Sequence, residues 1–155
     1  MSGFTDGTTD YPTDNENEED DTMATIPDSV RDKLEQANFW SFVTLNDDGS
    51  PTATPVWVDV DDGHVIVNTA AGRRKERNVR RDPRVALSMH EPENPYAWVE
   101  IRGRVVEFVE GAPADRSIDS LAKKYLGQDT YPYRAPDERR VLLRIEPDKV
   151  IVSGS

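Results

Sequence analysis

The chain has 155 residues, a formal net charge of −11 at pH 7 and no cysteine. This length suits one domain with a substantial core and is too short for two ordinary domains. The lack of cysteine excludes disulfides, thiol chemistry and a cysteine-based zinc site.

The acidity is concentrated in the N-terminal tail. Residues 1–25 hold eight of the 30 acidic residues and no Lys or Arg. This segment has few aliphatic side chains and no periodic pattern. It cannot bury enough apolar surface to offset the entropy lost on ordering, so we predict that it is disordered. Residues 26–155 carry 22 acidic residues against 19 basic ones and are predicted to form one nearly charge-balanced domain.

Composition also bears on where the protein resides. The N-terminus lacks the basic start and apolar run of a signal peptide. No stretch approaches the roughly 20 apolar residues that span a bilayer, so we expect a cytoplasmic protein that does not associate with membranes. Arg (14) outnumbers Lys (5), and Asp (18) outnumbers Glu (12). This balance is typical of halophilic proteins, although compositional drift together with an acidic tail explains it equally well.

The order of apolar and turn residues predicts three helices and six or seven strands. The first helix is amphipathic, and Asp28 or Ser29 can cap it. Two later turns contain glycine at the place expected for a β-hairpin. The predicted helices are residues 26–37, 72–81 and 113–126. The predicted strands are 39–46, 52–60, 64–69, 84–90, 96–110 and 141–154, the last with a turn at Pro147–Asp148. Tight turns indicate a largely antiparallel sheet, and closure into a small barrel would remove its exposed edges.

The basic segment 70–85 contains seven Lys or Arg residues among its sixteen. The charge is densest at Arg73, Arg74 and Lys75, in the first turn of the predicted helix. Cations at a helix N-terminus oppose the helix dipole, at a cost on the order of 1 kcal/mol for three. A bound anion would compensate for this cost, so the segment predicts a phosphate site. The alternatives are a solvated helix face paired with surface acids, and a nucleic-acid patch. The patch is disfavoured because the helix is short and the tail is acidic.

The segment "IVNTAAGRRKERNVRRDPRVALSM", followed by "NPYAWVEIRGRVVEF", resembles the flavin and deazaflavin oxidoreductases related to pyridoxamine 5′-phosphate oxidase. Within this family the chain looks most like the branch of F420-dependent enzymes. The resemblance covers about residues 30–152. It implies a mainly β fold with flanking helices, the FMN-binding split β-barrel with six or seven antiparallel strands. It also implies a homodimer with two cofactor sites at its interface.

The resemblance further implies which residues meet the cofactor. The basic helix would hold the phosphate, through Arg73 and Lys75 and, in addition, Arg74, Arg77 and Asn78. One strand would follow the ring system, at Thr54, Pro55, Val56 and Trp57. The next strand would line the phosphate and ribityl end, at Val67, Asn68 and Thr69. The opposite subunit would contribute from residues 96–103 and from near the C-terminus. The acidic tail of F420 needs further cations, for which the candidates are Arg102, Arg104 and Arg134.

The expected function is an oxidoreductase that uses F420 to transfer a hydride to or from a small organic substrate, such as an unsaturated or nitroaromatic acceptor. One alternative is an FMN-dependent oxidase or reductase of the pyridoxamine-phosphate-oxidase kind, and another is a non-catalytic flavin or F420 carrier. We single out no catalytic residue, and His64 and His90 make no recognisable metal site. Residues 128–140, with Tyr131 and Tyr133, form a loop able to close over the substrate pocket.

Overall fold

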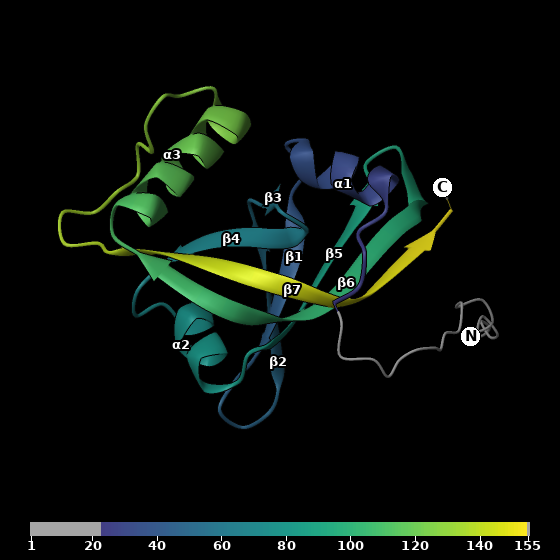
Figure 1. Ribbon diagram of the computed structural model, residues 1–155, viewed down its shortest axis with the longest axis horizontal. Coiled ribbons are helices and arrows are strands. Elements are labelled where there is room, and N and C mark those ends of the chain that lie inside the picture. The colour runs from purple at the N-terminus through teal and green to yellow at the C-terminus, as the bar shows by residue number, and fades with distance from the viewer. Residues whose placement is uncertain (1–22, 155) are drawn as a thin grey trace.

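The computed structural model of the chain describes residues 23–154 (Figure 1). The disorder predicted for the acidic tail therefore concerns residues that lie outside this part, apart from residues 23–25. Among these, Ala24 N–H donates to Pro147 O at 2.8 Å. The described residues form three helices and seven strands. In chain order they are α1 (Asp28–Glu35), β1 (Trp40–Leu45), β2 (Pro51–Val56), β3 (Asp59–Asp61), β4 (His64–Ala70), α2 (Arg74–Arg81), β5 (Arg84–Glu91), β6 (Asn94–Glu110), α3 (Ala112–Leu126) and β7 (Arg140–Ser153).

Most predicted elements are present, but the prediction is wrong in several places, three of which concern a helix start or a turn. Helix α1 has Pro27 at its N-cap and no side-chain cap, so Asp28 and Ser29 lie inside the helix. Helix α2 begins at Arg74 rather than at residue 72. The turn predicted at Pro147–Asp148 is instead an irregularity within the continuous strand β7, where the pairing with β6 shifts register. Pro147 and Asp148 favour a turn locally, but they do not end the strand because β7 pairs with the long strand β6 on both sides of them.

The strands form one antiparallel sheet in the order β2-β1-β5-β6-β7-β4-β3. The mainly β fold class with flanking helices is therefore confirmed. We had expected the sheet to close into a barrel. Among the described residues, however, no hydrogen-bonded ladder joins the edge strands β2 and β3, so the sheet is open between them. The strands β2 and β3 follow each other in the chain but lie at opposite edges of the sheet. A curved sheet that stays open between such edges is a split barrel. In Figure 1, β7 runs between α3 on one side and α2 on the other.

The break between β2 and β3 was not predicted, because residues 52–60 alternate like a single strand. At the break, Val58 is fully buried and its backbone bonds to side chains of α3. Its N–H donates to the Tyr125 hydroxyl at 3.0 Å, and its carbonyl accepts from Lys124 Nζ at 2.7 Å. These side chains satisfy the backbone without a ladder. The chain can therefore leave one edge of the sheet and continue at the other.

Strand β4 presents different faces to the two layers that it separates. Val65 and Val67 belong to the main core, which also contains Trp40. Ile66 packs on the opposite face, in a smaller cluster with residues of α3 and β7. Asn68 continues this second face, and its Nδ2 donates to Ala114 O at 2.9 Å. The end of β4 therefore lies where α2, α3 and the start of β7 converge. Within the described residues, no helix is long and apolar enough to cross a membrane.

One glycine of the segment "EIRGRV" is required by the packing of β6 on β7. A Cβ atom added at Gly103 would lie 2.3 Å from the carbonyl oxygen of Glu146. No side chain can occupy such a space, because the obstacle is backbone. The close approach coincides with the register shift between the two strands, where Gly103 faces Pro147.

Candidate functional site

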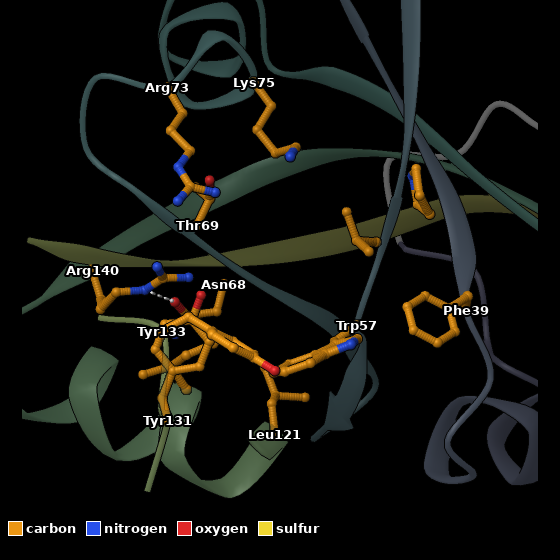
Figure 2. Close-up of a pocket in the computed structure, with 13 residues that line it drawn as sticks. Phe39, Trp57, Asn68, Thr69, Arg73, Lys75, Leu121, Tyr131, Tyr133 and Arg140 are labelled. Carbon is orange, nitrogen blue, oxygen red and sulfur yellow. Dashed lines mark hydrogen bonds between the residues drawn. The ribbon is translucent and has the colours of Figure 1, made fainter. Parts of the chain in front are cut away.

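A cavity of about 200 Å³ lies between the start of α2, the helix α3 and the ends of β2 and β4 (Figure 2). We call it the main cavity. Its lining combines cationic, aromatic and aliphatic side chains. These are Phe39, Pro55, Val56, Trp57, Asn68, Thr69, Arg73, Lys75, Ile118, Leu121, Tyr131, Tyr133 and Arg140. No carboxylate lines it among the described residues, which makes the cavity electropositive.

Arg73 and Lys75 form one side of the main cavity. Figure 2 shows both side chains reaching from the start of α2 toward it. Neither side chain has a hydrogen bond or an ion pair with the part of the chain that the structure describes. Burial lowers the pKa of Lys75 below the ordinary lysine value, and the nearby charges of Arg73 and Arg140 lower it further. Such a lysine is stabilised when an anion approaches.

The start of α2 is stabilised without help from these cations. Gly72 has a φ of +91°, which a side chain would oppose, and this turns the chain from β4 into the helix. Gly72 N–H then donates to Glu76 Oε1 at 2.9 Å, and Arg80 pairs with the same carboxylate at 2.7 Å. Burial alone would raise the pKa of Glu76, but these two partners outweigh it and lower the pKa. The helix start therefore carries its own acid, and the charges of Arg73 and Lys75 remain available.

The opposite side of the cavity is made by Arg140 and the end of β4. Arg140 is only 4% exposed. Its Nε donates to Asn68 Oδ1 at 2.9 Å, and its guanidinium forms an ion pair with Glu138. Thr69 lies between this group and α2 and is 2% exposed. Its hydroxyl oxygen has no hydrogen-bond partner among the described residues. A buried hydroxyl without a partner costs about 1–3 kcal/mol, so this atom points to a ligand with a polar group.

Aromatic side chains form the wall of the cavity, and α3 fixes their positions. The Trp57 ring stacks on Tyr125, with centroids 5.2 Å apart. Tyr125 is held in turn, because its hydroxyl donates to Asn38 O at 2.6 Å and accepts from Val58 N–H. Burial raises the pKa of Tyr125 to about 12. Tyr131 meets Trp57 edge-on at 6.1 Å, and Tyr133 meets Tyr131 at 5.8 Å. The wall is therefore a preorganised apolar surface suited to a flat ring.

The structure brings together seven of the twelve residues that were predicted to bind the cofactor. Those that line the main cavity are Pro55, Val56, Trp57, Asn68, Thr69, Arg73 and Lys75. Thr54 and Arg74 instead line a second cavity of about 240 Å³, which shares Arg73 and Lys75 with the first.

The remaining three predicted residues lie elsewhere. Val67 is fully buried in the core, because its position in β4 faces inward. Arg77 and Asn78 line a third cavity near the β1–β2 turn and do not line the main one. Asn78 is buried and donates to Thr44 Oγ1 and Asn46 Oδ1, both at 3.0 Å. Its contacts join α2 to β1.

Sequence reasoning missed Phe39, Ile118, Leu121 and Arg140. Ile118 and Leu121 have the pattern of ordinary core residues of a helix, so nothing in the sequence marks them as lining a cavity. Arg140 follows another arginine at the start of a strand, and its burial depends on Glu138 and Asn68. The loop residues Tyr131 and Tyr133 were expected near the pocket, and the structure places them on it.

The three arginines suggested for an acidic cofactor tail have carboxylate partners. Arg102 pairs with Glu100 at 3.0 Å, Arg104 with Asp148 at 2.9 Å and Arg134 with Asp115 at 3.0 Å. None of the three lines the main cavity. Their charge is thus largely balanced within the protein.

Neither histidine lines the main cavity. His90 is exposed, and its Nδ1 lies 3.2 Å from Glu91 O. His64 lies at the β3–β4 turn, with its Nδ1 3.0 Å from Asp62 O. Residues 23–154 contain no cluster of three or more His, Asp or Glu side chains placed to hold a metal ion.

Comparisons with known proteins agree with this fold. The family profile described as pyridoxamine 5′-phosphate oxidase matches residues 26–153. A solved structure described as an F420 reductase is 27% identical, with a TM-score of 0.69 over 81% of this chain and 98% of its own. A conserved hypothetical protein from Mycobacterium tuberculosis is 22% identical, with a TM-score of 0.65 over 88% and 89% of the two chains.

A more distant structure shares the fold alone. The heme storage protein from Vibrio cholerae is 15% identical, with a TM-score of 0.61 over 84% of this chain and 96% of its own. The search of curated proteins found no match.

Proposed function

This chain belongs to the pyridoxamine 5′-phosphate oxidase family, and we propose that it is an oxidoreductase that binds coenzyme F420 in the main cavity. In this proposal it transfers a hydride between the cofactor and a small organic substrate. The hydride chemistry is supplied by the deazaflavin when it is bound, and the protein supplies binding, orientation and electrostatics. The described lining of the cavity contains no His, Asp or Glu, which is compatible with this division of work.

The observation that carries the proposal is the pair of free cations beside an unpartnered buried hydroxyl. The side chains of Arg73 and Lys75 form no hydrogen bond or ion pair with the described part of the chain, and Arg73 acts only through space on Glu138. The hydroxyl of Thr69 lies on the same cavity and has no hydrogen-bond partner among the described residues. A phosphate group offers negative charge to the two cations and an acceptor oxygen to the hydroxyl. The residues present therefore fit the phosphate of a flavin-type cofactor.

The other lining residues fit the remainder of such a cofactor. Trp57, which Tyr125 holds in place, would lie along the ring system together with the end of β2. Asn68 and Arg140 would meet the polar chain between ring and phosphate. The loop that carries Tyr131 and Tyr133 would exclude water from the reacting face.

A homodimer is part of the proposal because the main cavity of one chain is small. Its volume of about 200 Å³ is below the roughly 300–1,000 Å³ typical of pockets that enclose a whole small molecule. A ring system, a ribityl chain and a phosphate need more room than this. We propose that a second copy of the chain completes each site, so that one dimer holds two cofactors.

The choice of F420 over FMN rests on the similarity to the F420 reductase, which extends over 98% of that chain at 27% identity. FMN remains the alternative, because its phosphate fits the same two cations and the family profile is described by an oxidase. A carrier that binds the cofactor without turnover would use the same cavity.

Native mass spectrometry of the purified protein, titrated separately with F420 and with FMN, tests the proposal. We expect a dimer that takes up two F420 molecules and little FMN. Preferential uptake of FMN would move the protein to the flavin alternative, and binding of neither would contradict the proposed site. Reduced F420 that is reoxidised faster with protein than without it, across a panel of unsaturated and nitroaromatic acceptors, would distinguish an enzyme from a carrier.

A further inference from the structure

Arg140 is the least exposed charged residue among residues 23–154, and the anion proposed for the main cavity does not account for its burial. Taking a guanidinium group out of water is costly unless its charge is paired and its N–H groups meet acceptors. Arg73 and Lys75 already offer the cavity two cations that no described residue pairs. The contacts of Arg140 with the protein therefore indicate what this third cation contributes.

The guanidinium group of Arg140 joins segments that are distant in the sequence. Its Nε donates to Asn68 Oδ1 of β4 at 2.9 Å, as the dashed line in Figure 2 shows. Its Nη1 donates to Glu138, which belongs to residues 127–139 between α3 and β7, here named the aromatic loop. Its Cζ lies 5.0 Å from the centroid of the Tyr131 ring, within the range of a cation–π contact. A planar guanidinium can make all three contacts, whereas an ammonium group is a single point charge.

Both polar partners of Arg140 are themselves fixed. Asn68 Nδ2 donates to Ala114 O of α3 at 2.9 Å. Burial alone would raise the pKa of Glu138, but the hydrogen bonds from Arg140 and from Ala135 N–H outweigh it and lower the pKa. The carboxylate is therefore charged at neutral pH, and the ion pair holds the guanidinium in one orientation.

Tyr131 is the side chain of the aromatic loop that depends on this orientation. Its backbone N–H donates to Asp119 Oδ1 of α3 at 2.8 Å, which fixes the main chain but not the direction of the ring. The ring meets Trp57 edge-on and lies against Arg140. Tyr133 also meets the ring, but it is 66% exposed and gives little support. The place of the Tyr131 ring in the cavity wall is thus set by Trp57 and Arg140.

We propose that Arg140 is a positioning residue that holds Tyr131 beside the ring of the bound cofactor. This inference rests on the proposed function and divides the work of the cations in the same cavity. Arg73 and Lys75 bind the phosphate, whereas Arg140 acts on the ring end through Tyr131. The wall is thereby ordered before the ligand arrives, so that less conformational entropy is lost on binding.

The other ion pairs of the aromatic loop do not serve this purpose. Arg134 pairs with Asp115 at 3.0 Å, and Asp129 pairs with Lys123 at 3.2 Å. Neither cation lines the main cavity. Pairs that are open to solvent contribute little to stability. They attach the loop to α3, but no cation–π contact joins them to Tyr131.

The first test uses the protein without cofactor and follows hydrogen exchange of the Tyr131 backbone N–H. Arg140→Lys keeps the charge and loses the planar group. Arg139→Lys is the matched control, because this exposed neighbour pairs with Glu110 and lies outside the main cavity. We expect exchange to be about fivefold faster in Arg140→Lys, as for the loss of one cation–π contact, and unchanged in the control. Unchanged exchange in Arg140→Lys would overturn the inference.

The second test is a double-mutant cycle on affinity for F420, or for FMN if the flavin is preferred. Calorimetry compares wild type, Arg140→Lys, Tyr131→Leu and the variant with both changes. We expect Arg140→Lys to weaken binding about 3- to 10-fold. In the Tyr131→Leu background it should have almost no further effect, because the guanidinium acts through the ring. Tyr131→Phe keeps the ring and should bind like wild type.

Each outcome bears on a different statement. Equal losses from Arg140→Lys with and without Tyr131 would mean that Arg140 meets the ligand directly, which overturns the inference and leaves the proposed function intact. Tyr131→Leu leaves the buried ion pair in place and tests the inference even if Arg140→Lys does not fold. Unchanged affinity in Tyr131→Leu would also overturn it. Failure of the wild-type protein to bind either cofactor would contradict both the inference and the proposed function.

Discussion

The two halves of helix α2 use the same residue type in different ways. In the second half, Arg80 pairs with Glu76 and Glu110, and Arg81 pairs with Asp47. In the first half, no ion pair with a carboxylate of the described part of the chain is formed by Arg73, Arg74, Lys75 or Arg77. An arginine with an internal partner contributes to structure, whereas one without a partner leaves charge for a ligand. The density of basic residues alone does not distinguish these two cases.

The largest expected effect comes from removing the two unpaired cations that line the main cavity at the start of α2. The double variant Arg73→Ala/Lys75→Ala should weaken cofactor binding by about 1–3 kcal/mol, because it removes two charged hydrogen-bond donors to the phosphate. Isothermal titration calorimetry with F420, or with FMN if the flavin is preferred, measures the change. The exposed Arg116→Ala is the matched control and should bind like wild type. Unchanged affinity in the double variant would mean that this half of α2 is not the phosphate site.

The next effect concerns Glu76, the carboxylate that pairs with Arg80 inside α2. Glu76→Ala should lower the free energy of unfolding by about 1–2 kcal/mol, because Gly72 N–H loses its acceptor and Arg80 loses a partner. Glu76→Gln retains an acceptor for Gly72 and should cost less. Urea unfolding of the apo proteins measures both. If Glu76→Ala were as stable as wild type, the start of α2 would not depend on this carboxylate.

A smaller effect is expected in the pH dependence of binding. In the free protein the pKa of Lys75 is lowered by burial and by its cationic neighbours. A bound phosphate favours the charged amine and raises this pKa again. Affinity should therefore be highest below the pKa of free Lys75 and fall as the pH rises through it. Titrations across alkaline pH measure this decline. Lys75→Arg should flatten it, and an equally steep decline in that variant would assign the titration to another group.

The smallest effect is on the stability of the protein without ligand. Because the pKa of Lys75 is lower in the folded state than in the unfolded chain, its charge opposes folding below that pKa, and the penalty disappears as the pH rises through it. Lys75→Met should therefore stabilise the apo protein at neutral pH by about 0.5 kcal/mol while weakening ligand binding. Thermal unfolding measures the gain, with the exposed Lys123→Met as control. A loss of stability would show that Lys75 supports the fold rather than the ligand.

Much of the architecture was predictable because hairpin turns and alternating strands are local signals. Six predicted strands correspond to observed ones, and the predicted end of the basic helix at residue 81 coincides with the end of α2 at Arg81. The break at Val58 was not predictable, since it depends on Tyr125 and Lys124, more than sixty residues away. The same contacts also fix Trp57 beside the main cavity.

The candidate site, too, was predictable from the sequence only in part. By itself the sequence determined that residues 73–75 concentrate positive charge at a helix start, because composition and spacing are read along the chain. Only the tertiary structure decided which of these charges stay free, by placing Glu76 against Gly72 and Glu138 against Arg140. It also decided that Val67 faces the core while Thr69 is buried at the cavity without a partner. Pairing and burial depend on residues that are distant in sequence, and these meet only when the sheet curves and α3 packs against it.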